Sequence, residues 1–126
     1  MKIKLKSTDE LKAVFHLIHQ LYVHAVERAD SAGRDEMTTA SDLHLRMVAL
    51  LLGELRKKLA RQIINSISER PNLKLDGPTG LALLAAWYAT DATALEASPL
   101  GMAVINEVAD TLARALAGPV VLKYFL

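Results

Sequence analysis

The chain has 126 residues, a formal net charge of +1 and an apolar fraction of 52%. This length suits one domain with its own core, so we expect residues 1–126 to form a single helical domain. Because the chain contains no cysteine, disulfide frameworks, thiolate metal sites and thiol nucleophiles are excluded, and a cytoplasmic location is favoured. No apolar run is of the length and type of a signal peptide or membrane span, which predicts a protein without a membrane partner.

Residues 2–6 alternate as Lys-Ile-Lys-Leu-Lys, the pattern of a short half-buried strand with an exposed basic side. Residues 72–76, Asn-Leu-Lys-Leu-Asp, repeat this alternation. Each segment is too short to be stable alone, so we expect the two to pair as a small two-stranded ribbon. Between them, residues 7–31 are predicted to form the first helix, in which Ser7 and Glu10 have the spacing of a capping box.

The longest predicted helix covers residues 38–70 and is the centre of the expected fold. Strong helix formers run through it, and Pro71 stops it. At about 100° per residue, one group of apolar side chains falls on a single side. This group consists of Leu45, Val48, Leu52, Leu55, Leu59 and Ile63. We therefore expect this side of the helix to face the core.

A second apolar group lies on nearly the opposite side of the same helix, in its first half. Leu43, Met47 and Leu50 make up this group, and further along the chain the same side becomes charged. A surface helix needs only one apolar side to pack on a core. We therefore expect the first half to be sandwiched between helices or to contact a second copy of the chain. These three are the candidate interface residues, whereas the second half should face water.

Two further helices are expected in the last third of the chain. Residues 81–89 are apolar on every side and predict a helix that begins after Gly77 and Pro78 and is buried by its own fold or by an oligomer. Residues 99–117 form the last helix, and residues 90–97 either extend the third helix or link the two. The apolar residues 120–126 should dock on the body or on a neighbouring subunit. The predicted fold is all-α, a four-helix bundle-like domain with a long central helix and the small ribbon.

Four histidines are the first candidates for metal ligands. His16, His19 and His24 lie on the first predicted helix and His44 on the second, but three ligands cannot converge from there. A pair formed by His16 and His19 with a third ligand from elsewhere is the remaining alternative. No serine or threonine stands in a triad-like or nucleophile-elbow context, and no phosphate-binding glycine loop is present. We therefore expect no metal, no cofactor and no catalysis.

The basic side chains are unevenly distributed. Residues 38–75 carry seven basic and three acidic side chains, and residues 76–126 carry two basic and five acidic. Within the central helix, a basic cluster consists of Arg46, Lys57, Lys58 and Arg61. Such a face contacts phosphates in nucleic-acid-binding proteins, although a plain solvated face has the same composition. A small DNA-binding or regulatory protein that uses this face is therefore the alternative function.

The preferred function is that of a small non-catalytic structural or adaptor module that self-associates as a homodimer. The second stripe of the central helix, the apolar third helix and the apolar last residues together exceed what four helices need for a core. Contact with a second copy of the chain is the simplest way to bury this surface. Contact with a different protein is the other alternative.

Overall fold

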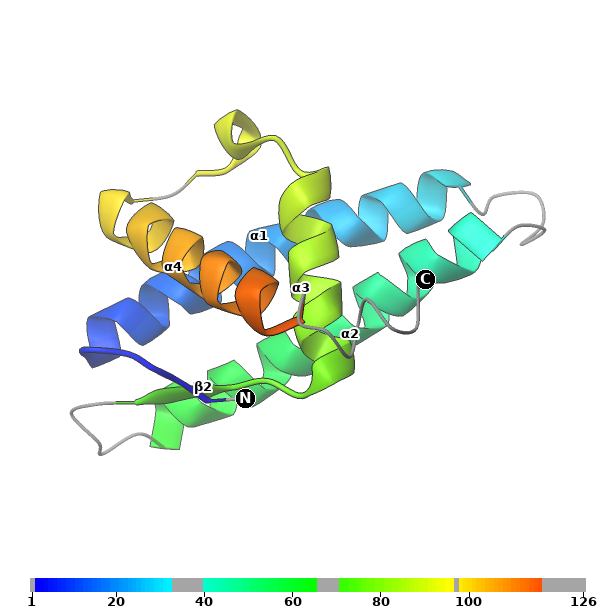
Figure 1. The fold of residues 1–126 in the computed structure, drawn as a ribbon. Coiled ribbons are helices and arrows are strands. Elements are labelled where there is room, and N and C mark those ends of the chain that lie inside the picture. Colours follow the sequence, from blue (N-terminus) through cyan, green and yellow to red (C-terminus); the bar gives the residue numbers. More distant parts are fainter. Residues whose placement is uncertain (1, 33–39, 66–70, 97, 117–126) are drawn as a thin grey trace.

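The computed structural model describes residues 2–32, 40–65, 71–96 and 98–116 (Figure 1). In chain order, its elements are strand β1 (Lys2–Lys4), helices α1 (Thr8–Ala32) and α2 (Ala40–Asn65), strand β2 (Asn72–Lys74), helix α3 (Gly77–Ala89), the 3₁₀ turn η1 (Ala92–Ala94) and helix α4 (Pro99–Leu116). The predicted all-α fold with four helices and a two-stranded ribbon is confirmed.

The two longest helices, α1 and α2, lie side by side and run in opposite directions (Figure 1). Helix α3 crosses them and packs mainly on α2, while α4 packs on α1 and α3. The core lies where the four helices and the ribbon meet. Its most deeply buried large side chains are Leu11, Leu17, Ile18, Leu21, Leu52, Leu59, Leu73, Leu83, Ile105 and Leu112. The predicted core stripe of α2 therefore faces inward.

The start of α1 is capped by side chains, as its sequence predicts. The backbone N–H of Glu10 donates to Ser7 Oγ at 3.3 Å, and Glu10 Oε2 accepts from the backbone N–H of Lys6 at 3.1 Å. In the common capping box the glutamate accepts from the cap residue itself. Here it accepts from the preceding residue, so the same pair of side chains also fixes the chain as it enters from β1.

Helices α3 and α4 also begin at side-chain caps. Asp76 Oδ1 accepts from the backbone N–H of Thr79 at 2.7 Å, and Ser98 Oγ accepts from the backbone N–H of Gly101 at 3.1 Å. A proline follows each cap within two residues, where a helix needs no amide hydrogen. These caps set where the two shorter helices start.

The ribbon is antiparallel and shorter than predicted, because the strands end at Lys4 and Lys74 rather than continuing for two further residues. Ile3 lies opposite Leu73 on the side that faces the core. Beyond the paired residues, Leu5 and Leu75 are buried, and the Leu5 N–H donates to the carbonyl of Pro71 at 2.9 Å. The ribbon is thus held to the core by its apolar positions.

The segment between α3 and α4 is a link, which decides between the two alternatives that the sequence allows. Helix α3 ends at Ala89, the C-cap residue Thr90 is extended, and η1 follows. The side-chain amide of Gln20 on α1 fixes this link by donating to the Glu96 carbonyl at 2.6 Å and accepting from the Glu96 N–H at 2.7 Å. The link is therefore tied to α1 through its backbone.

Helix α3 is only partly buried by its own fold: Leu81 and Tyr88 are exposed, while Ala82, Leu83 and Ala86 are buried. The reason is that α3 is an outer helix whose described neighbours cover only part of its circumference. Of the two expectations for this helix, burial by its own fold holds for one side only, and burial by an oligomer stays a prediction. No helix in the described ranges is long and apolar enough to cross a membrane. The expected docking of residues 120–126 and the ends of the predicted central helix lie outside the described residues.

Candidate functional site

The three candidate interface residues lie together on the outer side of α2. Leu43 is 57% exposed, Met47 52% and Leu50 71%, although each has an apolar side chain. They follow one stripe because their spacing of four and three residues matches the helical repeat. The described helices do not sandwich this side of α2, so the first of the two sequence alternatives does not hold within the described residues. We call these three residues the α2 patch.

A hollow of about 180 Å³ lies beside the α2 patch, in the groove between α1 and α2. Tyr22 and Val26 of α1 and Leu50 and Gly53 of α2 are among the residues that line it. The hollow depends on Gly53, because a Cβ at this position would lie 3.1 Å from Cε2 of Tyr22. The missing side chain thus allows the two helices to approach and leaves a depression next to the patch.

The side chain of Arg56 on α2 contacts two residues of α1. Its guanidinium lies 4.5 Å from the centre of the Tyr22 ring, and its Nη1 lies 3.3 Å from Nδ1 of His19. A cation over an aromatic face is attracted by the ring quadrupole. These contacts join α2 to α1, which gives Arg56 and His19 a structural role.

The structure separates the basic cluster into parts. Lys57, Lys58 and Arg61 are exposed on the second half of α2, as predicted, and Lys57 Nζ lies 3.6 Å from Oε1 of Glu54. Arg46 lies about 16 Å further along the helix axis, since a helix rises about 1.5 Å per residue. It is half-buried, and its Nε is enclosed without a hydrogen-bond partner among the described residues. Arg46 is therefore separated from the other three along the helix and is less exposed than they are.

The ribbon adds basic residues that the sequence analysis did not include among the site residues. Lys2 pairs directly with Lys74 across the two strands, and Lys4 lies on the same outer side of β1. Gln62 of α2 donates from Nε2 to the Asn72 carbonyl at 2.8 Å, which holds the second half of α2 against β2. The alternation of lysines in both strands is visible in the sequence and could have indicated these residues. Only the register shows that two of the lysines face each other.

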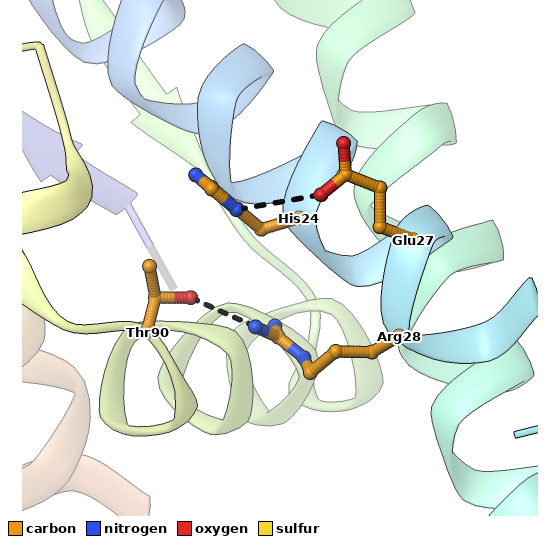
Figure 2. Close-up of polar contacts among 4 residues, drawn as sticks. All are labelled: His24, Glu27, Arg28 and Thr90. Carbon is orange, nitrogen blue, oxygen red and sulfur yellow. Dashed lines mark hydrogen bonds and ion pairs between the residues drawn. The ribbon is translucent and has the colours of Figure 1, made fainter. Parts of the chain in front are cut away.

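Figure 2 shows a separate polar cluster at the junction of α1 and α3. Arg28 Nη1 donates to Thr90 Oγ1 at 3.2 Å, and His24 Nδ1 lies 3.8 Å from Oε2 of Glu27. The first contact joins α1 to the end of α3, which gives Arg28 a structural role. The four candidate histidines do not converge, and across the described ranges no three His, Asp or Glu side chains are grouped to hold a metal ion.

Among the described residues, two carboxyl groups have a lowered pKa, and both are caps. Hydrogen bonds from the side chain and backbone N–H of Thr79 lower the pKa of Asp76, and the positive charge of Lys58 adds to this effect. Hydrogen bonds from Thr93, first from its backbone N–H, lower the pKa of Asp91 in the same way. Each shift favours the charged carboxylate at the start of a helix or turn, so a structural role explains both.

Comparison of the chain with protein-family models, with curated proteins and with solved structures finds no match. Function is therefore argued from the chain's own surfaces. Two of these stand out: the α2 patch with its adjoining hollow, and the exposed lysines and arginine that the ribbon and the second half of α2 bring together.

Proposed function

We propose that this protein is a small non-catalytic structural or adaptor module that self-associates as a homodimer through the α2 patch. The observation that carries the proposal is the exposure of Leu43, Met47 and Leu50, which are each more than half exposed on one stripe of a long helix. Single exposed apolar side chains are ordinary, but three on one stripe form a contiguous patch of the kind that marks contact sites. The cysteine-free composition supports a cytoplasmic setting for the module.

A second copy of α2 fits this patch by charge. In an antiparallel pair related by a twofold axis at Leu50, residues equally distant from Leu50 on either side lie at the same level along the two helices. Arg46 and Glu54 are each four residues from Leu50, so Arg46 of one copy lies level with Glu54 of the other. The symmetry produces this pair twice. Opposite charges at the rim of an apolar contact favour one register over its neighbours.

The same arrangement also fits by shape. Met47 and Gly53 are each three residues from Leu50, so Met47 of one copy lies level with Gly53 of the other, which has no side chain. That position borders the hollow beside Tyr22. Methionine adapts well to an irregular depression because its side chain is unbranched and flexible. Leu43 likewise lies level with Lys57, whose aliphatic stem covers apolar surface while its ammonium stays in water.

Light scattering over a protein concentration series tests the proposal, with Leu50→Glu as the variant. We expect the wild-type chain to have the mass of two copies and the variant the mass of one, because the substitution buries two like charges at the axis of the dimer. Ile64→Glu is the matched control. Ile64 is 80% exposed on the same helix but lies outside the proposed overlap, so this variant should remain a dimer.

The folded state should tolerate both substitutions, since exposed positions usually change stability by less than about 0.5 kcal/mol. Circular dichroism of the two variants checks this point. A wild-type chain that has the mass of one copy at every concentration would contradict the proposal. Equal dissociation by the two variants would place the contact elsewhere on the molecule.

A further inference from the structure

We infer that the ribbon and the adjoining half of α2 form a binding surface for the phosphate backbone of duplex nucleic acid. We call this surface the basic face, and it consists of Lys2, Lys4, Lys58, Arg61 and Lys74. All five side chains are exposed. The inference is independent of self-association, because the basic face and the α2 patch have no residue in common.

The first support is the register of the ribbon. Lys2 and Lys74 are direct cross-strand partners, and like charges in this position destabilise a strand pair. Lysines do protect exposed strand edges against unwanted pairing. One lysine on either strand is enough to protect the edge. Edge protection therefore does not explain two lysines that face each other. A bound anion would remove the repulsion between them.

The second support is the lack of internal neutralisation. In the described part of the chain, none of the five side chains has a carboxylate within 4.0 Å, and the ion pair on α2 involves Lys57 instead. Asp76 is the acidic group near Lys58, but its carboxylate accepts hydrogen bonds from Thr79. Within the described ranges, the positive charge of the basic face is thus not neutralised by a direct ion pair.

The third support is that two separate elements converge on this surface. The hydrogen bond from Gln62 to the Asn72 carbonyl holds α2 against β2, and Figure 1 shows the ribbon alongside the second half of α2. Lys58 and Arg61 therefore belong to the part of α2 that adjoins the ribbon. The result is a basic surface wider than one helix, as is needed to contact several phosphates.

The character of the basic face selects duplex nucleic acid among polyanions. The apolar ribbon residues Ile3 and Leu73 face the core, so the outer side of the ribbon has no apolar side chain to insert into a lipid bilayer. In the described second half of α2, Ile64 is the one large apolar side chain that is exposed. No aromatic side chain belongs to the face, which disfavours the stacking that single-strand binders use. Lysines that contact phosphates give binding without base recognition. We therefore expect binding that depends on salt and is independent of sequence.

Fluorescence anisotropy with a labelled DNA duplex of about 20 base pairs tests the inference over a salt series. The variant is the double substitution Lys2→Glu and Lys74→Glu. It replaces two facing ammonium groups with two facing carboxylates, so the like-charge pairing in the ribbon stays the same. We expect weaker binding, and a salt slope that falls by about 0.9 for each lysine that contacts a phosphate.

The matched control is Lys12→Glu with Arg114→Glu, which changes the net charge equally. Lys12 points away from the core side of α1, and both residues are exposed. At about 0.15 M salt, charges beyond roughly 8 Å are screened, so the control should bind as the wild type does. Lys58→Glu with Arg61→Glu should weaken binding without altering the ribbon.

Three results would overturn the inference. The first is an absence of salt-dependent binding by the wild-type chain. The second is an equal loss of duplex affinity in the control and the ribbon variant, which would show that binding depends only on the net charge of the protein. The third is binding to vesicles that contain phosphatidylserine without binding to the duplex, which would assign the basic face to membranes. Performing the titrations on Leu50→Glu as well keeps the outcome separate from that of the dimer proposal.

Discussion

Gly80 of α3 lies directly against Leu112 of α4. A Cβ at Gly80 would lie 3.1 Å from Cδ2 of Leu112 and 3.6 Å from Cδ1 of Leu116. Leu112 is only 1% exposed, so its side chain has little room to move. The close contact between the two helices at this point therefore depends on the absence of a side chain.

We predict that Gly80→Ala destabilises the protein. An overpacked core costs about 1–3 kcal/mol, and the higher helix propensity of alanine offsets about 0.5–1 kcal/mol of this. The expected net loss in the free energy of unfolding is therefore about 1 kcal/mol, measured by urea denaturation. Gly77→Ala is the control, because no atom lies within 4 Å of a Cβ at Gly77. It should be neutral or stabilising, and equal effects of the two substitutions would show that Leu112 can move aside.

The cap of α3 predicts a dependence of stability on pH. The native pKa of Asp76 is lowered by its hydrogen bonds with Thr79. A carboxyl group with a lowered native pKa contributes stability above its unfolded pKa, and this contribution is lost as the pH falls through the native pKa. Asp76→Ala should therefore have a lower urea midpoint than the wild type near neutral pH, and the difference should shrink below the ordinary value of 3.8.

Asp76→Asn separates the charge from the hydrogen bond at this cap. Asparagine retains an oxygen that can accept from the Thr79 N–H, but it does not titrate. This variant should keep much of the stability near neutral pH and lack the change at acid pH. A difference between wild type and Asp76→Ala that stays constant down to about pH 2 would show that the charge at this position has no effect.

A charge exchange tests the register of the proposed dimer. Arg46→Glu alone places two carboxylates opposite each other across the twofold axis, and Glu54→Arg alone places two guanidinium groups there. Each should weaken the dimer, seen as a higher dissociation constant in sedimentation or light scattering. The double variant restores opposite charges and should dimerise more strongly than either single variant. Additive losses in the double variant would show that the two residues do not face each other.

Helical periodicity predicted the fold class of this chain. In the inward stripe of α2, Val48, Leu52 and Leu59 are buried as expected, while its end members Leu45 and Ile63 are half-buried. One apolar side of a helix must be removed from water in any compact arrangement. Side-chain chemistry at the helix starts was equally informative. Ser7 and Ser98 accept the backbone hydrogen bonds that their positions before a helix imply.

Periodicity could not predict which helices lie next to each other in the fold. It placed Leu43, Met47 and Leu50 on one stripe, but only the fold shows that no described helix covers them. Arg56 directly precedes Lys57 and Lys58 in the sequence, but only the fold shows that its guanidinium lies over the Tyr22 ring. These outcomes depend on which helix lies next to which, and a linear pattern does not record this.

The ribbon shows the same limit for strands. Alternation predicted which side of each strand faces the core, and Leu73 is fully buried. The facing pair Lys2 and Lys74 depends on register, and short flanking segments do not fix register when both are equally apolar. The basic face could therefore be recognised only after the pairing was known.

The pairing of β1 with β2 has a consequence for synthesis on the ribosome. Lys2 is added to the chain well before its partner Lys74, and about 70 residues take roughly 4–14 s at about 5–20 residues per second. Both long helices are synthesised within that interval. The two strands then pair only by closing a loop of about 70 residues, which has an entropic cost. The strand translated before α1 and α2 thus reaches its place only after both of them have left the ribosome.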